Sequence, residues 1–310
     1  MTIHAPAKVN LFLEALERRP DGYHAIRSVL APVSVFDVVT LEHRDGDIET
    51  TLDPNGAIGA DLLPDAASPE NLAARAARAL KEETGWSGGA RIHVVKNIPV
   101  GGGLGGGSAD AAAVLVGLDT LWNTGLSRER LMDVGARLGS DIPALIHGGW
   151  VVMEGRGERV TPLETDGART RPRPWLVLAN PGFHVSTRDV YRRYTALTLS
   201  GTPFNNVLSV LKKGNVSEMA QAVFNSLQSC VFEKYPMTEM TAEGLADAGA
   251  LGVLLCGSGA TVMGLARDRD HARDIEQTVR ARLDFPVWSQ VAQLLPDGVM
   301  VAHGPLEARV

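Results

Sequence analysis

The chain has 310 residues, of which 45% are hydrophobic and 21% are charged, values typical of a soluble globular protein of two domains. Its formal net charge of −6 argues against a protein that coats nucleic acid, because phosphate backbones require clustered Lys and Arg. Two cysteines cannot form a disulfide framework, no window approaches the ~20 apolar residues of a membrane span, and residues 1–6 show no signal-peptide pattern. We therefore expect a cytoplasmic protein without nucleic-acid or membrane partners.

The first half of the sequence predicts strands that lead into helices. Strands are indicated by apolar or alternating residues at 3–16, 28–36, 37–42, 47–52 and 91–96. Helices are indicated at 68–83, 108–122 and 128–138. We expect residues 47–52 to form a hairpin with the strand before them, and the first helix to start at Ser68 with Pro69 in its first position. Residues 149–154 and 158–163 predict a further hairpin.

The second half alternates strands and helices, which is typical of an α+β domain. Strands and helices are predicted at 175–179, 187–194, 216–228, 237–248, 252–256, 261–266 and 269–283. The charged, proline-containing segment 164–174 is the predicted linker, so the expected domains are residues 1–165 and 175–310. Cys256 lies in an apolar run and is expected to be a buried, structural thiol.

The most informative segment is a glycine-rich run that separates a predicted strand from a predicted helix. Six of the seven residues at 101–107 are glycine, so the backbone can approach a bulky anion without side chains in the way. The helix that begins near Ser108 would direct free N–H groups and its positive dipole end at that anion. The Ser108 hydroxyl is a candidate ligand for a phosphate oxygen or a magnesium ion. The segment predicts a phosphate-binding loop.

Three other interpretations of this run fit less well. The dinucleotide fingerprint Gly-x-Gly-x-x-Gly is satisfied by chance in so many glycines, and it is expected after an early strand rather than a hundred residues into the chain. The Walker A pattern fails because no Gly-Lys-Ser/Thr ends the run. A flexible linker would not join such regular elements.

The run from Pro99 to Asp110 strongly resembles the phosphate loop of the GHMP small-molecule kinases. Residues 6–13, Pro-Ala-Lys-Val-Asn-Leu-Phe-Leu, are similar to the first motif of that superfamily, and residues 255–260, Leu-Cys-Gly-Ser-Gly-Ala, to its C-terminal glycine motif. The resemblance implies a two-domain α+β fold, with an N-terminal ribosomal-protein-S5-like β/α domain that binds ATP and a C-terminal ferredoxin-like α/β sandwich. Ala144, Leu145 and Cys256 depart from the commoner residues, and residues 285–310 match little.

Finer features resemble the members of the superfamily that act on a cytidine diphosphate substrate. These features are Asp-Gly-Tyr-His at 21–24, Leu-Gly-Ser-Asp-Ile-Pro at 138–143, Pro-Gly at 181–182, and Ser-Thr-x-x-x-Tyr at 186–191. They imply MgATP-dependent phosphorylation of the 2-hydroxyl of 4-diphosphocytidyl-2-C-methyl-D-erythritol, in the non-mevalonate pathway to isoprenoids. A monomer or weak homodimer is expected. Another alcohol such as homoserine or a mevalonate-type acid, a catalytically dead nucleotide-binding protein, and a nicotinamide-dependent dehydrogenase remain open alternatives.

The resemblance also implies a role for individual residues. Asp141 would be the general base and Lys8 would favour the ionised carboxylate and offset charge on the phosphoryl oxygens. ATP would be bound by Asn71, Leu72, Lys96, Pro99, Gly101, Gly102, Gly103, Leu104, Gly105, Gly106, Gly107, Ser108 and Ala109. The acceptor would be bound by Asn10, Tyr23, His24, Thr187 and Tyr191, with the cytosine between the two tyrosines.

The residues alone leave simpler explanations open for several of these positions. Asp141 is also explained as a turn aspartate before Pro143, and Lys96 as a solvated lysine at a strand end. Residues 257–259, Gly-Ser-Gly, would support the active site or merely form a tight hairpin turn. Asn225 resembles a further family position without an assigned role.

Overall fold

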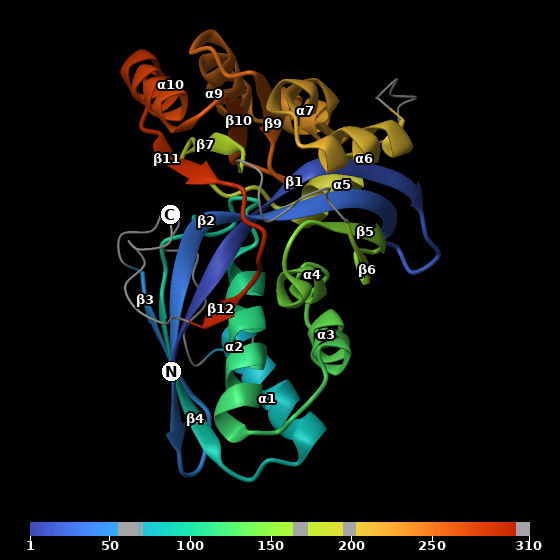
Figure 1. Ribbon diagram of the computed structural model, residues 1–310, viewed down its shortest axis with the longest axis vertical. Coiled ribbons are helices and arrows are strands. Elements are labelled where there is room, and N and C mark those ends of the chain that lie inside the picture. The colour runs from blue at the N-terminus through green and yellow to red at the C-terminus, as the bar shows by residue number, and fades with distance from the viewer. Residues whose placement is uncertain (55–67, 69–70, 164–172, 195–202, 302–310) are drawn as a thin grey trace.

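The computed structural model describes residues 1–54, 68, 71–163, 173–194 and 203–301, and within them the chain forms two β-sheets with helices packed around them (Figure 1). The strands are β1 (Thr2–Arg18), β2 (His24–Arg44), β3 (Glu49–Asp53), β4 (Gly89–Val95), β5 (Val151–Gly155), β6 (Arg159–Pro162), β7 (Trp175–Asn180), β8 (Phe224–Asn225), β9 (Gly252–Leu255), β10 (Val262–Ala266), β11 (Trp288–Gln293) and β12 (Met300–Val301). The helices are α1 (Leu72–Thr84), α2 (Gly106–Trp122), α3 (Arg128–Ala136), α4 (Ile142–His147), α5 (Thr187–Arg193), α6 (Phe204–Lys213), α7 (Val216–Ala222), α8 (Gln228–Lys234), α9 (Pro236–Asp247) and α10 (Arg269–Arg282).

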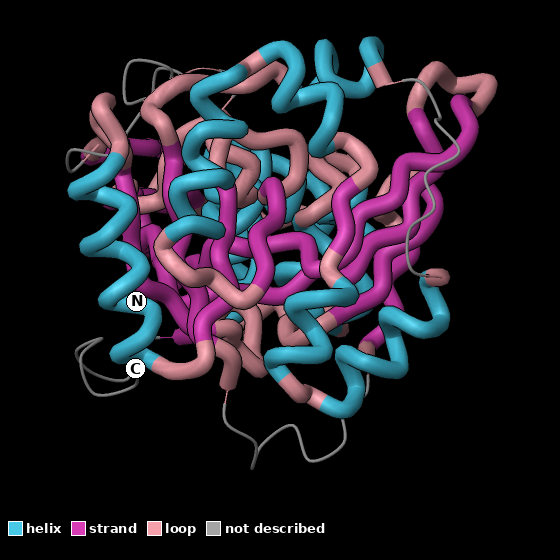
Figure 2. Tube along the Cα trace, turned by 90° about the horizontal axis from the view of Figure 1, so that it is seen from above, coloured by secondary structure: helices cyan, strands magenta, loops and turns pink. Residues whose placement is uncertain are grey.

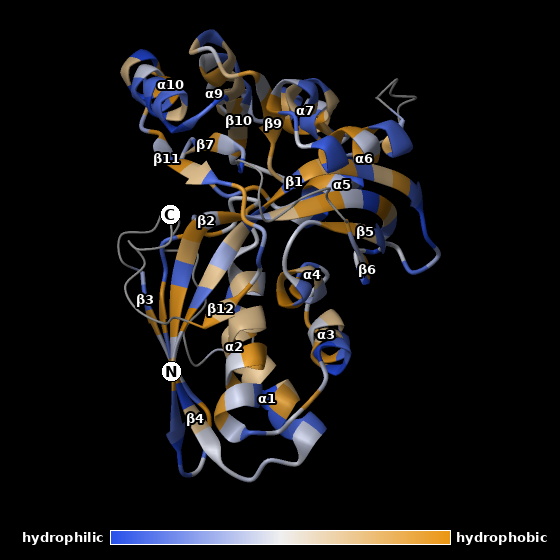
Figure 3. Ribbon diagram, in the orientation of Figure 1, coloured by the Kyte–Doolittle hydropathy of each residue, from blue (hydrophilic) through white to orange (hydrophobic). Residues whose placement is uncertain are grey.

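The first sheet is built on the long antiparallel pair β1 and β2. Its main path runs β12-β1-β2-β4-β3, while β5 pairs with β2 and β6, and β8 pairs with β1. One core fills the space between this sheet and helices α1 and α2. Helix α2 is buried around most of its circumference, and its Ala, Val and Leu residues are apolar as such burial requires (Figure 3). The glycine loop is therefore anchored to a helix at the centre of this half.

The second sheet is antiparallel, in the order β11-β7-β10-β9. Helices α9 and α10 pack against it, and α7 contacts its strands β9 and β10 (Figures 1 and 2). Two short strands from the second half of the chain, β8 and β12, belong to the first sheet, where they pair with β1. The α+β class predicted from the sequence is confirmed, and the linker predicted at 164–174 falls mostly outside the described residues.

The structure makes four corrections to the predicted elements. Residues 28–36 and 37–42 belong to one strand, β2, which runs on without a break. Strand β3 is not a hairpin partner of β2, because β4 lies between them and pairs with β3 in parallel. Helix α1 begins at Leu72 rather than Ser68, since the Asn71 side-chain oxygen caps it by accepting the N–H groups of Ala73 and Ala74.

The fourth correction concerns the single helix predicted at 216–228. Only its first part is helical, as α7, because Phe224 and Asn225 pair with β1 as β8 instead of continuing the helix, and α8 starts at Gln228. Helices α4, α6 and α8 and strands β11 and β12 were not predicted from the sequence. The other predicted helices and strands are confirmed to within a few residues.

Candidate active site

A cavity of about 1240 Å³ gathers residues from both halves of the chain. Most of the predicted site residues line it, whereas Leu104 and Ala109 are fully buried in the protein and do not. The residues that line it are Lys8, Asn10, Tyr23, His24, Asn71, Leu72, Lys96, Pro99, Gly101, Gly102, Gly103, Gly105, Gly106, Gly107, Ser108, Asp141, Thr187 and Tyr191. Residues far apart in the sequence are thus brought to one place.

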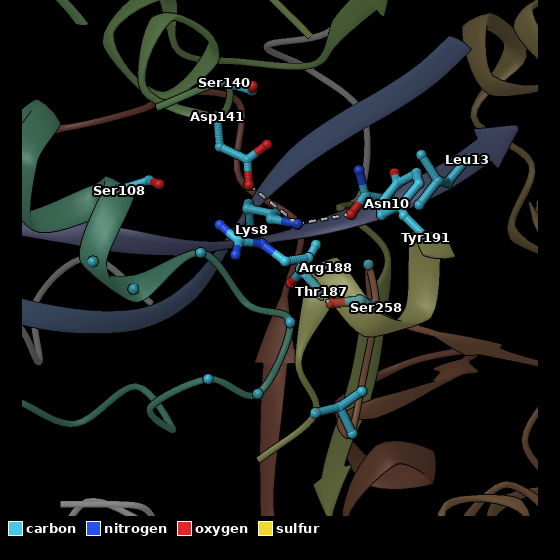
Figure 4. A pocket seen from close by; sticks show the side chains of 18 of the residues that line it. Lys8, Asn10, Leu13, Ser108, Ser140, Asp141, Thr187, Arg188, Tyr191 and Ser258 are labelled. Atoms are coloured by element: carbon cyan, nitrogen blue, oxygen red, sulfur yellow. Dashed lines mark hydrogen bonds and ion pairs between the residues drawn. The ribbon is translucent and has the colours of Figure 1, made fainter. Parts of the chain in front are cut away.

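Lys8 and Asp141 form an ion pair at the centre of this cavity, with 3.4 Å between Nζ and the carboxylate (Figure 4). Lys8 also donates to the Asn10 side-chain oxygen at 2.8 Å. The Asn10 amide nitrogen donates to Ser28 Oγ, which in turn donates to a backbone oxygen of β1, so this chain of bonds fixes the Asn10 oxygen toward Lys8. Asp141 stands at the start of α4 but its side chain makes no capping bond, which leaves the carboxylate facing the cavity.

The glycine loop is held between β1 and the second half of the chain. The Leu104 carbonyl accepts the Lys8 N–H at 2.9 Å, and the Gly102 carbonyl accepts the Thr261 N–H at 3.1 Å. Gly103 has a φ of +83°, and a Cβ atom there would overlap the carbonyl oxygen of Cys256. Helix α2 begins directly after the loop, at Gly106 rather than the predicted Ser108, so Ser108 lies within its first turn. The first N–H groups of α2 therefore face the cavity, as an anion site requires.

The C-terminal glycine turn, residues 257–259, is held in place by hydrogen bonds from the Asn225 side chain. Its amide nitrogen donates to the carbonyl oxygens of Leu255 and Gly257, and its oxygen accepts the Leu227 N–H. Ser258 in the same turn is hydrogen-bonded to Thr187 at 2.8 Å. Cys256 is fully buried as predicted, and burial raises the pKa of its thiol to about 12, so it is not available as a nucleophile.

Aromatic and imidazole rings also line the cavity. Tyr23 is 61% exposed, and the guanidinium of Arg156 lies over its ring at 5.3 Å. The His24 and Tyr191 ring centroids are 5.7 Å apart, and burial, together with the charge of Asp141, raises the pKa of the Tyr191 hydroxyl. Nδ1 of His24 lies 2.9 Å from the carbonyl oxygen of Leu16 and donates a hydrogen bond to it, which leaves Nε2 facing away from that bond.

Lys96 is buried with two carboxylates, Asp37 and Asp110, for which the sequence predicted no role. It is paired with Asp37 and, at 2.6 Å, with Asp110, so the alternative of a solvated strand-end lysine is wrong. Asp37 also accepts the backbone N–H groups of Asn97 and Ile98, which fixes the chain as it enters the glycine loop. Burial and the charge of Asp37 raise the pKa of Asp110, and the two carboxylates raise the pKa of Lys96 against the effect of burial.

Two classes of site are absent from the described part of the chain. No cluster of three or more His, Cys, Asp or Glu residues is positioned there to hold a metal ion. Nor does any of the described helices combine the length and apolar character needed to span a membrane.

Comparison with known proteins defines the class to which this fold and cavity belong. A model of the GHMP kinases N terminal domain matches residues 71–149, and one of the GHMP kinases C terminal domain matches residues 207–284. A solved homoserine kinase from Cytophaga hutchinsonii superposes with a TM-score of 0.77 over 97% of each chain, at 17% identity, which shows the common fold. The fold and the resemblance drawn from the three motifs are both confirmed.

Closer relatives carry the comparison further. A 4-diphosphocytidyl-2-C-methyl-D-erythritol kinase of Symbiobacterium thermophilum is 41% identical over 90% of this chain and 95% of its own length, and that of Geobacter metallireducens is 39% identical over 92% and 96%. A solved 4-(cytidine 5'-diphospho)-2C-methyl-D-erythritol kinase has 33% identity and a TM-score of 0.74 over 94% of this chain and 99% of its own. The chain belongs to the family of 4-diphosphocytidyl-2-C-methyl-D-erythritol kinases within the GHMP kinases.

Proposed function

We propose that this chain transfers the γ-phosphoryl group of ATP to the 2-hydroxyl of 4-diphosphocytidyl-2-C-methyl-D-erythritol, giving the 2-phosphate and ADP in the non-mevalonate pathway to isoprenoid precursors. Family membership supports the substrates. The observation that carries the chemistry is the convergence of the Lys8–Asp141 pair and the glycine loop on one cavity. Membership of a kinase family speaks against the dehydrogenase alternative.

The nucleotide occupies the end of the cavity lined by the glycine loop. The free N–H groups at the start of α2 and the positive end of its dipole bind the phosphates, and the side-chain-free loop lets them approach. Asn71 and Leu72, at the start of α1, line the same end and flank the adenine and ribose. Lys96 also lines the cavity, where it contacts Asp37 and Asp110.

Asp141 and Lys8 act on the reacting hydroxyl and phosphoryl groups. The Asp141 carboxylate accepts the hydroxyl proton as the acceptor oxygen bonds to the γ-phosphorus and the bond to the ADP oxygen breaks. Lys8, 3.4 Å away, keeps the carboxylate in place and offsets negative charge on the phosphoryl oxygens. Asn10 orients Lys8 and lies within reach of the reacting end of the acceptor.

The acceptor occupies the end of the cavity lined by rings. Tyr23 and Tyr191 stack on the cytosine from two separate elements of the chain, and His24 offers an acceptor nitrogen to its amino group. Thr187 is fixed by its bond to Ser258 and contacts the same ligand. Homoserine and mevalonate lack a base, so a chain specific for them would make no use of these rings.

A magnesium ion that arrives with the triphosphate fits the oxygen donors present. Mg²⁺ keeps several waters and typically takes one or two protein ligands besides phosphate oxygens. The Ser108 hydroxyl lines the cavity in the first turn of α2 and would hold it. When bound, the ion neutralises charge on the phosphates.

We further propose a cytoplasmic monomer or weak homodimer, with domains close to residues 1–165 and 175–310.

The test is an ATP-consumption assay with the cytidine substrate beside homoserine and mevalonate. Wild-type chain should turn over only the cytidine compound. Asp141→Asn should retain ATP binding but lose turnover by at least about 100-fold, as expected for loss of a positioned base. Asp133→Asn, an exposed aspartate on α3, is the control and should match wild type. Turnover of homoserine or mevalonate alone, or full activity in Asp141→Asn, would overturn the proposal.

A further inference from the structure

One cationic side chain in the cavity was not identified from any sequence motif. Arg188 lies in the first turn of α5, is exposed, and lines the same cavity as the glycine loop and Asp141. Figure 4 shows its side chain extending from α5 toward Lys8 and the glycine loop. Tyr191, one turn later on the same helix, points instead toward Asn10 and Leu13 (Figure 4). The two side chains of α5 thus face different ends of the cavity.

The backbone at Arg188 is held in place, although the Arg188 side chain is exposed. Thr187, the residue before it, is hydrogen-bonded to Ser258 in the C-terminal glycine turn. Ser186 caps α5 by accepting the Asp189 N–H, and Val185 and Val190 are buried in the core of the second half. The position from which the Arg188 side chain starts is therefore fixed, while its charged end is free to meet a ligand.

The other cations of the cavity already have protein partners. Lys8 is paired with Asp141 and Lys96 with Asp37 and Asp110. Within the described residues, Arg192 pairs with Asp189, Arg18 donates to the Gly22 carbonyl, and Arg156 covers the Tyr23 ring. Across the same ranges the Arg188 side chain has neither an ion pair nor a hydrogen bond. A guanidinium with five donors and no partner is suited to a phosphate group.

We infer that Arg188 is a further catalytic residue, which contacts the transferring γ-phosphoryl group from the side opposite the glycine loop. This inference rests on the proposed function. In the transition state the bond from the γ-phosphorus to the ADP oxygen breaks as that to the acceptor oxygen forms, and the hydroxyl proton passes to Asp141. Negative charge is then spread over the three equatorial oxygens and the leaving ADP. Arg188 neutralises part of this negative charge, because the charge of Lys8 is already partly offset by Asp141.

The acceptor carries a diphosphate of its own, which offers the same chemistry to a guanidinium. The direction of the side chain favours the transferring group, because Arg188 points to Lys8 and the loop rather than toward the rings that line the acceptor end (Figure 4). The two sources are separated by their effects on different constants. Loss of a contact to the transferring group lowers kcat, whereas loss of a contact to the acceptor diphosphate weakens binding of cytidine diphosphate.

The experiment compares Arg188→Gln and Arg188→Lys with wild type in steady-state kinetics, and measures binding of ADP and cytidine diphosphate by calorimetry. Arg188→Gln should lower kcat by about 100-fold, with both dissociation constants changed less than about threefold. Arg188→Lys should recover part of the loss. Arg193→Gln removes an arginine of the same helix that does not line the cavity, and should match wild type.

Two results would overturn the inference. One is an unchanged kcat in Arg188→Gln, and the other is weaker binding of cytidine diphosphate with kcat preserved at saturation. Both require that the wild-type chain phosphorylates the cytidine substrate in the same assay. If wild type itself is inactive toward that substrate, the proposed function fails rather than the role of Arg188.

Discussion

Lys8 connects three parts of the active site through one side chain and one backbone group. Its ammonium contacts Asp141 and Asn10, and its N–H is bonded to the Leu104 carbonyl of the glycine loop. A Cβ atom on Gly105 would lie 2.9 Å from Lys8 Cγ, so the loop and the lysine stem are packed as closely as glycine permits. A change at Lys8 is therefore expected to affect chemistry and loop position together.

Lys8→Met should lower kcat by at least about 100-fold while ADP still binds, because the cation is lost but the backbone donors of α2 remain. Steady-state kinetics and ADP titration measure the two effects separately. Lys81→Met, on the surface of α1, is the matched control and should keep wild-type values. An active Lys8→Met variant would show that the ion pair is structural only.

Asp110 makes the stability of the fold depend on pH in a defined direction. Burial and the nearby Asp37 raise its pKa in the folded chain, so between the two pKa values the folded state holds a proton that the unfolded state has released. Proton binding then favours folding, and this contribution is lost as pH rises toward the folded-state pKa of about 8. For one group the slope is at most about 1.4 kcal/mol per pH unit.

Urea unfolding of wild type and Asp110→Asn between pH 5 and 9 tests this prediction. The free energy of unfolding of wild type should fall with rising pH relative to that of the variant, which cannot lose a proton at this position. Asp119→Asn, at the far end of α2, should leave the wild-type slope in place. Parallel pH profiles for wild type and Asp110→Asn would contradict it.

That Lys8, Asp141 and the glycine loop lie together could be predicted from the sequence because short local motifs identify them. Lys8 lies beside Asn10 in one strand, and the glycines must be close together in sequence for the backbone to approach an anion. Arg188, Asp37 and Asp110 could not be assigned roles in this way, since each depends on elements that meet only in the folded chain. A lone arginine in a helix is usually solvated, and nothing local distinguishes Arg188 from its neighbours.

The glycine loop is an element whose shape depends on close packing as well as on its ligand. Gly101, Gly103 and Gly105 all have positive φ values, which favour glycine. At Gly103 the conformation coincides with direct contact to the C-terminal glycine turn, where a Cβ atom would overlap the Cys256 carbonyl. The loop is thus held in place by the second half of the chain.

Gly103→Ala should destabilise the protein and weaken ATP binding, since the loop must move away from the C-terminal turn. Gly125→Ala is the matched control, because Gly125 has a φ of +68° but nothing within 4 Å of the place that a methyl group would take. Both variants bear the backbone strain of about 1–2 kcal/mol, but only Gly103→Ala adds the clash. Thermal unfolding and ATP titration should therefore show a larger loss for Gly103→Ala, and equal losses would count against the packing role.

Secondary structure was most predictable where burial imposes a strong pattern. Helix α2 and strands β4, β9 and β10 follow from their apolar residues. The parallel pairing of β3 with β4 could not be derived, because sequence adjacency favours a hairpin and the order of strands is set by the whole sheet. Likewise β8 interrupts a helical pattern only because β1 offers it a partner.

The two halves of the molecule share strands and a core. One hydrophobic cluster combines Val9, Leu11 and Phe12 of β1 with residues of the second half such as Leu176 and Met263. Strands β8 and β12, which come from the second half of the chain, pair with β1 as well. The cavity is lined from both halves, so the active site depends on this shared core being formed. The two halves of the chain therefore do not have independent cores.

A fragment of residues 1–163 should therefore fail to fold as a stable unit. It would lose β8, β12 and the partners of Val9, Leu11 and Phe12, and burial of large side chains contributes roughly 1.5–3 kcal/mol each. Circular dichroism melting should show no cooperative transition, and gel filtration should show aggregates.

The control is the full chain cleaved at a protease site inserted between residues 163 and 173, which keeps both halves and should unfold cooperatively. Because the shared core is the cause, adding a separate fragment of residues 173–310 during refolding should restore phosphoryl transfer. A cooperative melt of the isolated fragment near the temperature of the full chain would show that its own sheet and helices suffice.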